Sequence, residues 1–328
     1  YLRSYEVNYQ LAPMNNHDII KTFLPKQLDI KCLELLQPAL QKSNLIVYGE
    51  IHGIKENSDV IYTLVKKLGV KRLAIEASPA ASNFINSVKI NSYDFSLVDE
   101  DLFDSSILSL EMIKTIAILL QQNQLKELIF IDTFFDNLDE DTIISASPQA
   151  REEELVKNIL KIDDSLLILC IMGQWHTQPE VVKNGETQHK SALYRLRKVK
   201  PNIPFIHNVY QQGQLFNDGK IIELPKNPSI PPYYEIVQKT DIDFELHIPK
   251  VTRISSCKNS KHLSLLLIGQ NHLLGLYCYR IGVWRSLVAR TVRDGEVAGS
   301  NPVTPTMILI NFWRKKCQIN FLTLPKNH

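Results

Sequence analysis

The chain has 328 residues, of which 44% are hydrophobic and 22% charged, a composition typical of globular proteins that excludes a disordered chain. Charge is unevenly distributed: residues 1–250 contain 26 Lys and Arg against 33 Asp and Glu, whereas residues 251–328 contain 11 basic and 2 acidic residues. Because the basic residues of the second segment are scattered, we interpret the shift as a domain boundary and expect no binding of nucleic acid.

The cysteines and the apolar stretches indicate the compartment. The five cysteines are odd in number and include no Cys-x-x-Cys pair, which argues against a disulfide framework and against a cysteine zinc site. Residues 1–10 lack the apolar core of a signal peptide, and polar residues interrupt the most apolar stretch, residues 263–284. We therefore expect a cytoplasmic protein without a membrane span. The sequence does not indicate an oligomeric state.

Short apolar runs alternate with helical patterns along the first two thirds of the chain. The runs lack polar alternation, as is typical of strands that are covered on both faces. They are Leu45–Tyr48, Arg72–Ile75, Leu128–Ile131, Leu166–Met172 and Ile203–Ile206, and the helical patterns are Asn57–Leu68, Ile107–Gln122 and Pro148–Leu160. For the first helix we expect Asn57 or Ser58 as N-terminal cap and Gly69 as C-terminal cap. The alternation predicts an α/β fold with a mainly parallel central sheet flanked by helices.

Two further elements and the domain limits complete this prediction. A helix over Ile30–Gln41 would lead into the first strand. The segments Gln214–Phe216 and Lys220–Leu224 flank an Asn-Asp-Gly turn and predict a late β-hairpin, at an edge of the sheet or as a small addition to it. We expect residues 1–44 to form a lead-in region, residues 45–255 the α/β domain, and residues 256–328 a poorly ordered tail outside any domain.

Each of the five predicted strands ends in an acidic residue or a histidine. These residues are Glu50 with His52, Glu76, Asp132, His176 and His207. In open α/β sheets, ligands bind beyond the carboxyl ends of the strands, where the loops converge. An ionised carboxylate is costly to bury unless it is paired. The pattern therefore predicts a site at this edge of the sheet.

The pair Glu50 and His52 carries the most specific chemistry. In extended backbone, residues two apart share a face, so the carboxylate can orient the imidazole and raise its pKa, as a general base needs. Alternatively, Glu50, His52 and His176 offer oxygen and nitrogen ligands for a divalent metal such as zinc, manganese or iron. Glu56 follows His52 by four residues, at or near a helix start.

Structural roles remain the alternative for each of these residues. Glu50 and His52 could form a local ion pair in an ordinary turn, and His176 could be a hydrogen-bonded core histidine. Glu76 could be a satisfied structural acid, Asp132 a loop cap and His207 a residue facing the core. Arg151 opens the run Arg151-Glu152-Glu153-Glu154, a pattern more typical of a solvated helix face. The other histidines considered, His17, His189 and His247, lack such context, and we expect them at the surface.

Several familiar motifs are absent from the sequence. It contains no Gly-x-Gly-x-x-Gly, no Gly-x-x-x-x-Gly-Lys-Ser/Thr, no Gly-x-Ser-x-Gly and no His-Glu-x-x-His. Their absence disfavours nucleotide-dependent chemistry and a serine nucleophile.

The run Ile46–Gly53, followed by Glu56, resembles the superfamily that joins erythromycin esterases, ChaN-like haem-binding proteins and Tiki/TraB proteins. The segments Ala74–Ala77, Arg151–Glu154 and Met172–His176 support the resemblance, which covers roughly residues 40–210. One residue separates Glu50 from His52, which looks more like the ChaN branch, whereas His52-Gly53 with Glu56 looks more like the esterase branch. The superfamily contains esterases, a metal-dependent protease and haem binders, so the resemblance implies a fold and a site location but no single reaction.

Our leading hypothesis is hydrolysis of a small-molecule ester, lactone or amide. His52 would activate water, and Glu50 would orient the imidazole or share a metal. Glu76 would be a base or ligand, His176 a second base, acid or ligand, and Arg151 would neutralise negative charge developing on oxygen. Asp132, Glu56, Trp175 and His207 would contact the substrate or support these side chains.

Two other hypotheses belong to different classes. In the first, the chain binds haem or iron without catalysis, with His52 or His176 as axial ligand and Trp175 lining the pocket. In the second, the fold is retained around a degenerate site that acts in binding only. Haem addition followed by absorption spectroscopy separates the first from hydrolysis.

Residues Gly282–Thr306 resemble a transfer-RNA gene translated in frame. Gly299–Pro302 can be encoded by the T-arm consensus, Val303–Pro305 by an acceptor stem ending in CCA, and Trp284–Arg290 fits a D-arm. On this hypothesis the domain ends near Ser255, and readthrough, a frameshift or a gene-calling error appends the remainder. A basic C-terminal extension is the alternative.

Overall fold

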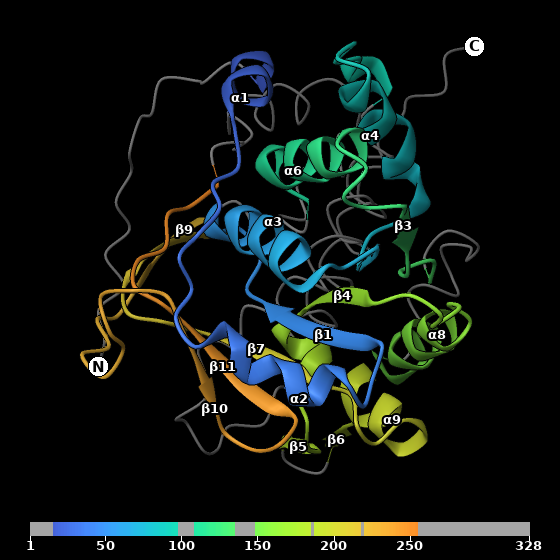
Figure 1. Ribbon diagram of the computed structural model, residues 1–328, viewed down its shortest axis with the longest axis vertical. Helices are drawn as coiled ribbons and strands as arrows, with labels where there is room; N and C mark the ends of the chain where they lie inside the picture. Colours follow the sequence, from blue (N-terminus) through green and yellow to red (C-terminus); the bar gives the residue numbers. More distant parts are fainter. Residues whose placement is uncertain (1–15, 98–107, 135–147, 185–186, 218–219, 255–328) are drawn as a thin grey trace, which may run out of the picture. The chain divides into compact units, whose positions relative to one another are not determined.

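The computed structural model describes residues 16–97, 108–134, 148–184, 187–217 and 220–254 (Figure 1). Of these, residues 16–182 and 189–254 belong to one compact unit. The expected tail, residues 256–328 with the Gly282–Thr306 segment, lies outside the described residues. No helix in the described ranges combines the length and the apolar character that a membrane crossing needs.

The compact unit is built on a seven-stranded sheet with the strand order β10-β11-β7-β1-β4-β2-β3. Every neighbouring pair is parallel except β10 and β11, which are antiparallel. The strands are β1 (Leu45–Glu50), β2 (Arg72–Ile75), β3 (Glu127–Phe130), β4 (Ile168–Gly173), β7 (Phe205–Tyr210), β10 (Glu235–Gln238) and β11 (Asp243–Ile248). The predicted α/β fold with a mainly parallel sheet is confirmed, and all five predicted strands are present.

Helices cover both faces of the sheet, and strand alternation divides the core between them. Ile46 and Tyr48 of β1 pack into a core with α3, α4 and α6, whereas Leu45 and Val47 pack into a second core with α8 and α9. Figure 1 shows α3, α4 and α6 on one side of β1 and β4, and α8 and α9 on the other. The helices are α3 (Glu56–Leu68), α4 (Ser82–Lys89), α6 (Leu110–Gln121), α8 (Pro148–Leu160) and α9 (Ala192–Val199).

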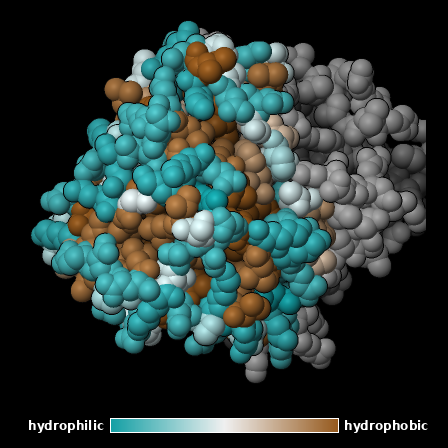
Figure 2. All heavy atoms as spheres, turned by 45° about the vertical axis from the view of Figure 1, so that its right-hand side comes forward, coloured by the Kyte–Doolittle hydropathy of each residue, from teal (hydrophilic) through white to brown (hydrophobic). Residues whose placement is uncertain are grey.

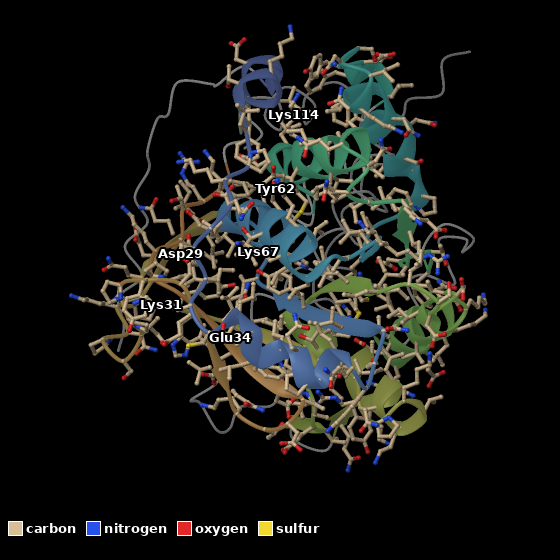
Figure 3. All side chains as sticks on the ribbon, viewed as in Figure 1. Asp29, Lys31, Glu34, Tyr62, Lys67 and Lys114 are labelled. Atoms are coloured by element: carbon tan, nitrogen blue, oxygen red, sulfur yellow. The ribbon has the colours of Figure 1, made fainter. Side chains whose placement is uncertain are left out.

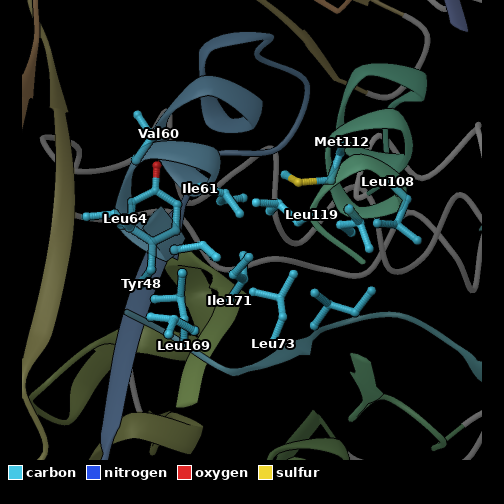
Figure 4. Close-up of a cluster of buried hydrophobic side chains, with 14 of the residues drawn as sticks. Tyr48, Val60, Ile61, Leu64, Leu73, Leu108, Met112, Leu119, Leu169 and Ile171 are labelled. Carbon is cyan, nitrogen blue, oxygen red and sulfur yellow. The ribbon is translucent and has the colours of Figure 1, made fainter. Parts of the chain in front are cut away.

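The first core fills the space between the sheet and the helices α3 and α6. Figure 4 shows Tyr48, Leu169 and Ile171 of the central strands facing Ile61 and Leu64 of α3. All five side chains are buried, with at most 4% of any residue exposed. Burial of a large aliphatic side chain contributes about 1.5–3 kcal/mol, so this layer fixes β1 and β4 beneath α3.

Helix α3 begins and ends close to the predicted limits, but its cap differs from the prediction. Gly69 has φ +71° and its N–H donates to Val65, so the predicted C-terminal cap is confirmed. At the other end, Lys55 is the N-cap residue and makes no side-chain capping bond. The Asn57 side chain is directed to Glu50 instead. Tyr62 and the exposed Lys67 lie on the outer part of the helix (Figure 3).

The lead-in segment and the late hairpin also differ from expectation. The predicted helix Ile30–Gln41 is wrong in its first half, because Lys31 pairs with Glu235 and Cys32 has φ +59°. A 3₁₀ turn (Leu33–Leu36) then leads into the short α2 (Gln37–Leu40). The predicted hairpin is present as β8 (Gly213–Asn217) and β9 (Lys220–Leu224), a separate two-stranded sheet. Helix α1 (Asn16–Thr22) precedes these elements.

One face of the molecule shows the expected mixture of surface residues. In Figure 2, hydrophilic residues make up most of the coloured surface, and hydrophobic residues show between them near its middle. Most strongly apolar side chains are instead in the two cores described above.

Candidate active site

The side chains of Glu50 and His52 form a pair at the carboxyl end of β1. His52 Nδ1 lies 2.9 Å from Glu50 Oε1. The second carboxylate oxygen of Glu50 accepts a hydrogen bond from the amide of Asn57, whose Nδ2 also donates to the Ile51 carbonyl at 2.9 Å. Behind it, the Asn208 amide donates to the Tyr48 hydroxyl at 2.6 Å. Glu50 is therefore held on both oxygens before any substrate binds.

Burial and the neighbouring charges shift the pKa values of the pair. Burial raises the pKa of Glu50, although the hydrogen bond and charge of His52 oppose the rise. For His52, burial alone lowers the pKa, but the hydrogen bond that its ring donates to Glu50 and the charges of Glu50 and Glu76 outweigh this effect, so the pKa is raised. An Nδ1–H donated to Glu50 leaves Nε2 of the neutral ring as a proton acceptor.

Gly173 brings His52 and Glu76 together. The Gly173 N–H donates to Glu76 Oε2 at 2.7 Å. A Cβ built on Gly173 would lie 2.7 Å from His52 Nε2 and 3.5 Å from Glu76 Oε2. Both side chains thus lie against the same residue, where β4 ends beside Glu50 of β1. A side chain at position 173 would therefore displace the imidazole from its present place.

A small cavity lies between the two carboxylates. Its volume is about 10 Å³, about the minimum that holds one water molecule. The lining residues are Glu50, Ile75, Glu76, Leu108, Met112 and Ile171. Figure 4 shows Leu108 and Met112 on the helix side of this region. Glu50 and Glu76 are the two acidic residues of this lining.

Arg151, in the first turns of α8, is the counter-charge of the site. Its Nη2 donates to Glu76 Oε1 at 2.8 Å and to Asp132 Oδ2 at 2.6 Å, and its Nε contacts the same Asp132 oxygen at 3.2 Å. Burial alone lowers the pKa of Arg151, but Asp132 and Glu76 raise it above its usual range. The Arg151 side chain is 10% exposed. The expected role of Arg151 is to neutralise charge on a substrate oxygen. A substrate oxygen would have to compete for the guanidinium with Glu76 and Asp132, which already accept its hydrogen bonds.

His176, in the turn after β4, links Glu76 to Glu152. Its Nδ1 lies 2.7 Å from Glu152 Oε1, and its Nε2 lies 3.1 Å from Glu76 Oε1. Burial opposes the charged ring, but Glu76 and Glu152 raise the pKa of His176 to about 10. This shift favours a charged ring at neutral pH, which donates from both nitrogens.

Two contacts of His176 Nε2 compete. Arg151 Nη1 also lies 3.1 Å away, and a guanidinium can only donate. A neutral ring would accept from Arg151, whereas the charged ring donates to Glu76. The raised pKa favours the charged ring, with Glu76 and Glu152 compensating the two adjacent cations. For Glu76, burial alone raises the pKa, but His176 and Arg151 lower it well below its usual range.

His189 is not at the surface, so that expectation is wrong. It is 7% exposed, and its ring stacks on Trp175 with a centroid separation of 4.0 Å. Its Nε2 lies 3.2 Å from the Trp175 carbonyl oxygen and 3.7 Å from Glu152 Oε1. Trp175 thus packs against His189 and supports the His176 turn.

Glu56 supports the His52 loop from outside the cluster. Its Oε2 accepts the Thr252 N–H at 2.7 Å, and burial raises its pKa. The same loop is held at Gly53, whose carbonyl accepts from Phe216 and Ile254 at 3.1 and 3.0 Å. Gly53 has φ +81°, and a Cβ there would meet the Phe216 carbonyl oxygen at 1.7 Å. A glycine is required at this position for both reasons.

His207 lies apart from the cluster. It is in register with Gly49 of β1 and Glu245 of β11, so it points to the face opposite Glu50. Its ring centroid is 5.9 Å from that of Phe205, and burial lowers its pKa. Of the nine expected site residues, Glu76, Asp132, Arg151 and His176 form one set of contacts, and Glu50 and His52 form a second. Both sets lie against Gly173, whereas Trp175 and Glu56 support adjacent segments.

Asn57 and Glu152 are central residues that the sequence interpretation missed. The sequence predicts a helix cap for Asn57 and a solvated helix face for Glu152, yet they are 2% and 1% exposed. The position of Glu152, one residue after Arg151 in a helix that follows a strand-end acid, was the available signal. Nothing in the local pattern distinguishes Asn57 from a cap.

The candidate metal set does not fit a divalent ion. Among the residues that the structure describes, no three His, Cys, Asp or Glu side chains group as a metal site. Both nitrogens of His176 face carboxylates, and both oxygens of Glu50 accept hydrogen bonds. The cation between the buried carboxylates is the Arg151 guanidinium. We therefore derive no step through a metal.

His176 does not fit the role of a haem ligand either. An axial histidine needs a free ring nitrogen and an open face for the macrocycle. His176 is 3% exposed and engaged at both nitrogens, and Trp175 packs on His189. The cavity lined by Glu50 and Glu76 has room for about one water molecule, which is far less than a haem needs.

Comparisons with known proteins show low similarity throughout. No family model and no curated protein match the sequence. A protein from Bacillus cereus is 11% identical with a TM-score of 0.48, covering 75% of this chain and 100% of its own. A succinoglycan biosynthesis protein is 13% identical with a TM-score of 0.45, covering 73% and 98%. A mutant of the erythromycin esterase EreC in its open conformation is 11% identical with a TM-score of 0.40, covering 73% and 83%.

Proposed function

We propose that the chain hydrolyses an ester, lactone or amide, with His52 as general base toward a water held between Glu50 and Glu76. The observation that carries the proposal is the Glu50–His52 pair, in which the carboxylate orients the imidazole, together with a cavity of about 10 Å³ lined by Glu50 and Glu76. In this proposal the water gives one hydrogen bond to Glu76 and the other to His52 Nε2, since His52 Nε2 and Glu76 Oε2 both lie against Gly173.

The proposed reaction uses residues whose protonation states are consistent with their contacts. His52 Nε2 takes a proton from the water, whose oxygen attacks the substrate carbonyl carbon. Glu50 accepts Nδ1–H and stabilises the resulting imidazolium. The imidazolium then returns the proton to the departing oxygen or nitrogen as the carbon–heteroatom bond breaks. Glu76 stays ionised beside Arg151 and His176, so it remains an acceptor for the second proton of the water.

Exposure supports His52 as the residue that meets the substrate. Its side chain is 14% exposed, whereas those of Glu50, Glu76 and His176 are 2–4% exposed. A carbonyl compound that reaches the cluster therefore contacts the imidazole first. Arg151 and His176 act through Glu76 in this proposal, as positioning residues.

Substrate panels with two histidine variants test the proposal. The purified chain is assayed with p-nitrophenyl esters, aliphatic lactones and anilides. His52→Ala should lower kcat/KM by about 10²-fold or more for any hydrolysed substrate. The matched control is His247→Ala, on β11, where His247 contacts Glu245 and not the cluster. Unchanged hydrolysis by His52→Ala, or loss in both variants at equal stability, contradicts the proposal.

A further inference from the structure

Glu152 is the buried acid that the proposed reaction does not use. It is 1% exposed, and each oxygen has one short contact. Oε1 lies 2.7 Å from His176 Nδ1, and Oε2 accepts the Ala192 N–H at 2.7 Å. Ala192 is the first residue of α9 after the N-cap Ser191. The Glu152 carboxylate thus connects the turn after β4, which contains His176, to the first residue of α9.

We propose that Glu152 is a positioning residue that holds His176 in a single ring orientation, with Nδ1–H toward Glu152 and Nε2–H toward Glu76. The geometry carries this assignment: an imidazole fixed at both nitrogens cannot rotate without breaking a contact of 2.7 Å and one of 3.1 Å. The N-terminal end of α9 further stabilises the negative charge of Glu152. The activity arm of its test rests on the proposed function, and the spectroscopic arm does not.

The groups that face His176 come from four elements. Glu76 follows β2, Arg151 and Glu152 belong to α8, His52 follows β1, and His189 ends β6 (Thr187–His189). The charges of Glu76 and Glu152 favour the imidazolium, and those of Arg151, His52 and His189 oppose it when they are positive. After Glu76, Glu152 contributes most to the charged ring, both by its charge and by its hydrogen bond to the ring.

His189 does not compete for Glu152. Its Nε2 lies 3.2 Å from the Trp175 carbonyl, an acceptor, so this nitrogen carries the proton. Burial lowers the pKa of His189, which keeps the ring neutral. Its contact to Glu152 is 3.7 Å, longer than a hydrogen bond. Of the two imidazoles, His176 and His189, Glu152 therefore forms a hydrogen bond only with His176.

Removing the Glu152 charge should change the protonation state of His176 and the hydrogen-bond partner of its Nε2. Without it, the adjacent Arg151 disfavours a charged His176, and Nε2 of the neutral ring accepts from Arg151 Nη1, which is already 3.1 Å away. Glu76 then loses its donor from His176. In the proposed reaction this frees Glu76 to move away from the water.

The test compares Glu152→Gln with Glu153→Gln. Both remove one carboxylate charge from neighbouring positions of α8, but the Glu153 side chain is 63% exposed and pairs with Arg195. The first readout is the ¹⁵N spectrum of the His176 ring at neutral pH, assigned with a His176→Gln variant. We expect two protonated nitrogens in the unchanged chain and in Glu153→Gln, and one unprotonated nitrogen in Glu152→Gln. The second readout is kcat and KM on the substrate found above, where Glu152→Gln should lower kcat about tenfold or more with little change in KM.

The outcomes separate the two proposals. An imidazolium spectrum that persists in Glu152→Gln overturns the role of Glu152, whatever the activity. A ring that changes in a chain without any hydrolytic activity supports the positioning role and removes the proposed function. If Glu152→Gln does not fold, Glu152→Asp decides. It keeps the charge, so a charged ring with restored kcat supports the assignment, and a neutral ring overturns it.

Discussion

The imidazole of His52 occupies the space that a side chain at Gly173 would need, since a Cβ there would lie 2.7 Å from Nε2. The backbone at Gly173 has φ −60° and ψ 150°, which any residue adopts without strain. A Gly173→Ala substitution therefore displaces His52 without distorting β4. We expect kcat/KM to fall about 10²-fold, and the free energy of unfolding to fall by about 1–3 kcal/mol.

A double-mutant cycle is the control for this prediction. In a His52→Ala background the obstacle is gone, so Gly173→Ala should cost little further stability and no further activity. Chemical denaturation and steady-state kinetics measure both quantities. Additive losses in the cycle would mean that the two residues do not meet.

Glu50 should set the pH at which His52 becomes active. Glu50→Gln keeps the shape of the side chain but removes the charge that raises the pKa of His52. A general base works when it is deprotonated, so the rising limb of kcat/KM against pH should move to lower pH in this variant. We also expect kcat to fall about 10²-fold or more because the imidazolium loses its stabilising partner. A rising limb that stays in place would rule out His52 as the titrating base.

Arg151 should be the largest single contributor to stability in the cluster. Arg151→Met leaves Glu76 and Asp132 buried without their counter-charge, which costs about 3–5 kcal/mol. Lys157→Met is the control on the same helix, because its partner Glu154 and the 60% exposed lysine form a surface pair worth about 1 kcal/mol at most. Urea unfolding measures both variants. Adding Asp132→Asn to Arg151→Met should recover part of the loss, and equal costs for Arg151 and Lys157 would contradict the buried network.

How far the sequence predicts this site depends on whether the determining contact is local. The strand-end positions of Glu50, Glu76 and His176 follow from short apolar runs, because a buried parallel strand requires such a run. Arg151 and Glu152 looked like a solvated helix face, since a run of charges carries no sign of burial. Their burial results from where α8 begins, against the ends of three strands. The burial of Arg151 and Glu152 thus depends on tertiary structure, and the local sequence does not reveal it.

Strand β11 and helix α9 were not predicted, although local signals for both exist. In β11 the burial alternates strictly from Asp243 to Ile248, as in a strand with one covered face. Helix α9 begins at the N-cap Ser191, whose side chain accepts from the Tyr194 N–H. The period-2 pattern of β11 differs from the continuous apolar runs of the five predicted strands, which are covered on both faces. Asn57 is the opposite case: a good local cap candidate whose amide binds Glu50.

The charge state of His176 should make the fold lose stability at alkaline pH. Its pKa is raised from an ordinary value to about 10, and in the unfolded chain it is about 6.5. A raised folded-state pKa gives stability that is complete below the unfolded value and is lost as pH rises through the folded value. The free energy of unfolding should therefore decline between about pH 6.5 and 10.

Replacing His176 identifies the source of this decline. His176→Gln cannot titrate, so its unfolding free energy should be lower at pH 7 and should fall less steeply toward pH 10. His52 contributes in the same direction because its pKa is also raised, so a reduced slope, and not a flat line, is expected. If the unfolding free energy of the two chains fell equally steeply with pH, a group other than His176 would cause the decline.

The domain limit near residue 255 can be tested by two truncations. Residues 251–254 belong to the described unit and hold the His52 loop: Lys55 N–H donates to the Thr252 carbonyl at 2.8 Å, and Ile254 N–H donates to Gly53 at 3.0 Å. Val251 and Ile254 are both 1% exposed. If residues 256–328 stand outside the domain, a chain ending at Ser256 should keep the thermal midpoint and kcat/KM. A chain ending at Lys250 loses both backbone bonds and the two buried side chains, so its midpoint should fall by several degrees or more and activity should disappear. Thermal scans and kinetics of the two chains measure this, and equal losses in both would mean that the folded unit needs residues beyond 256.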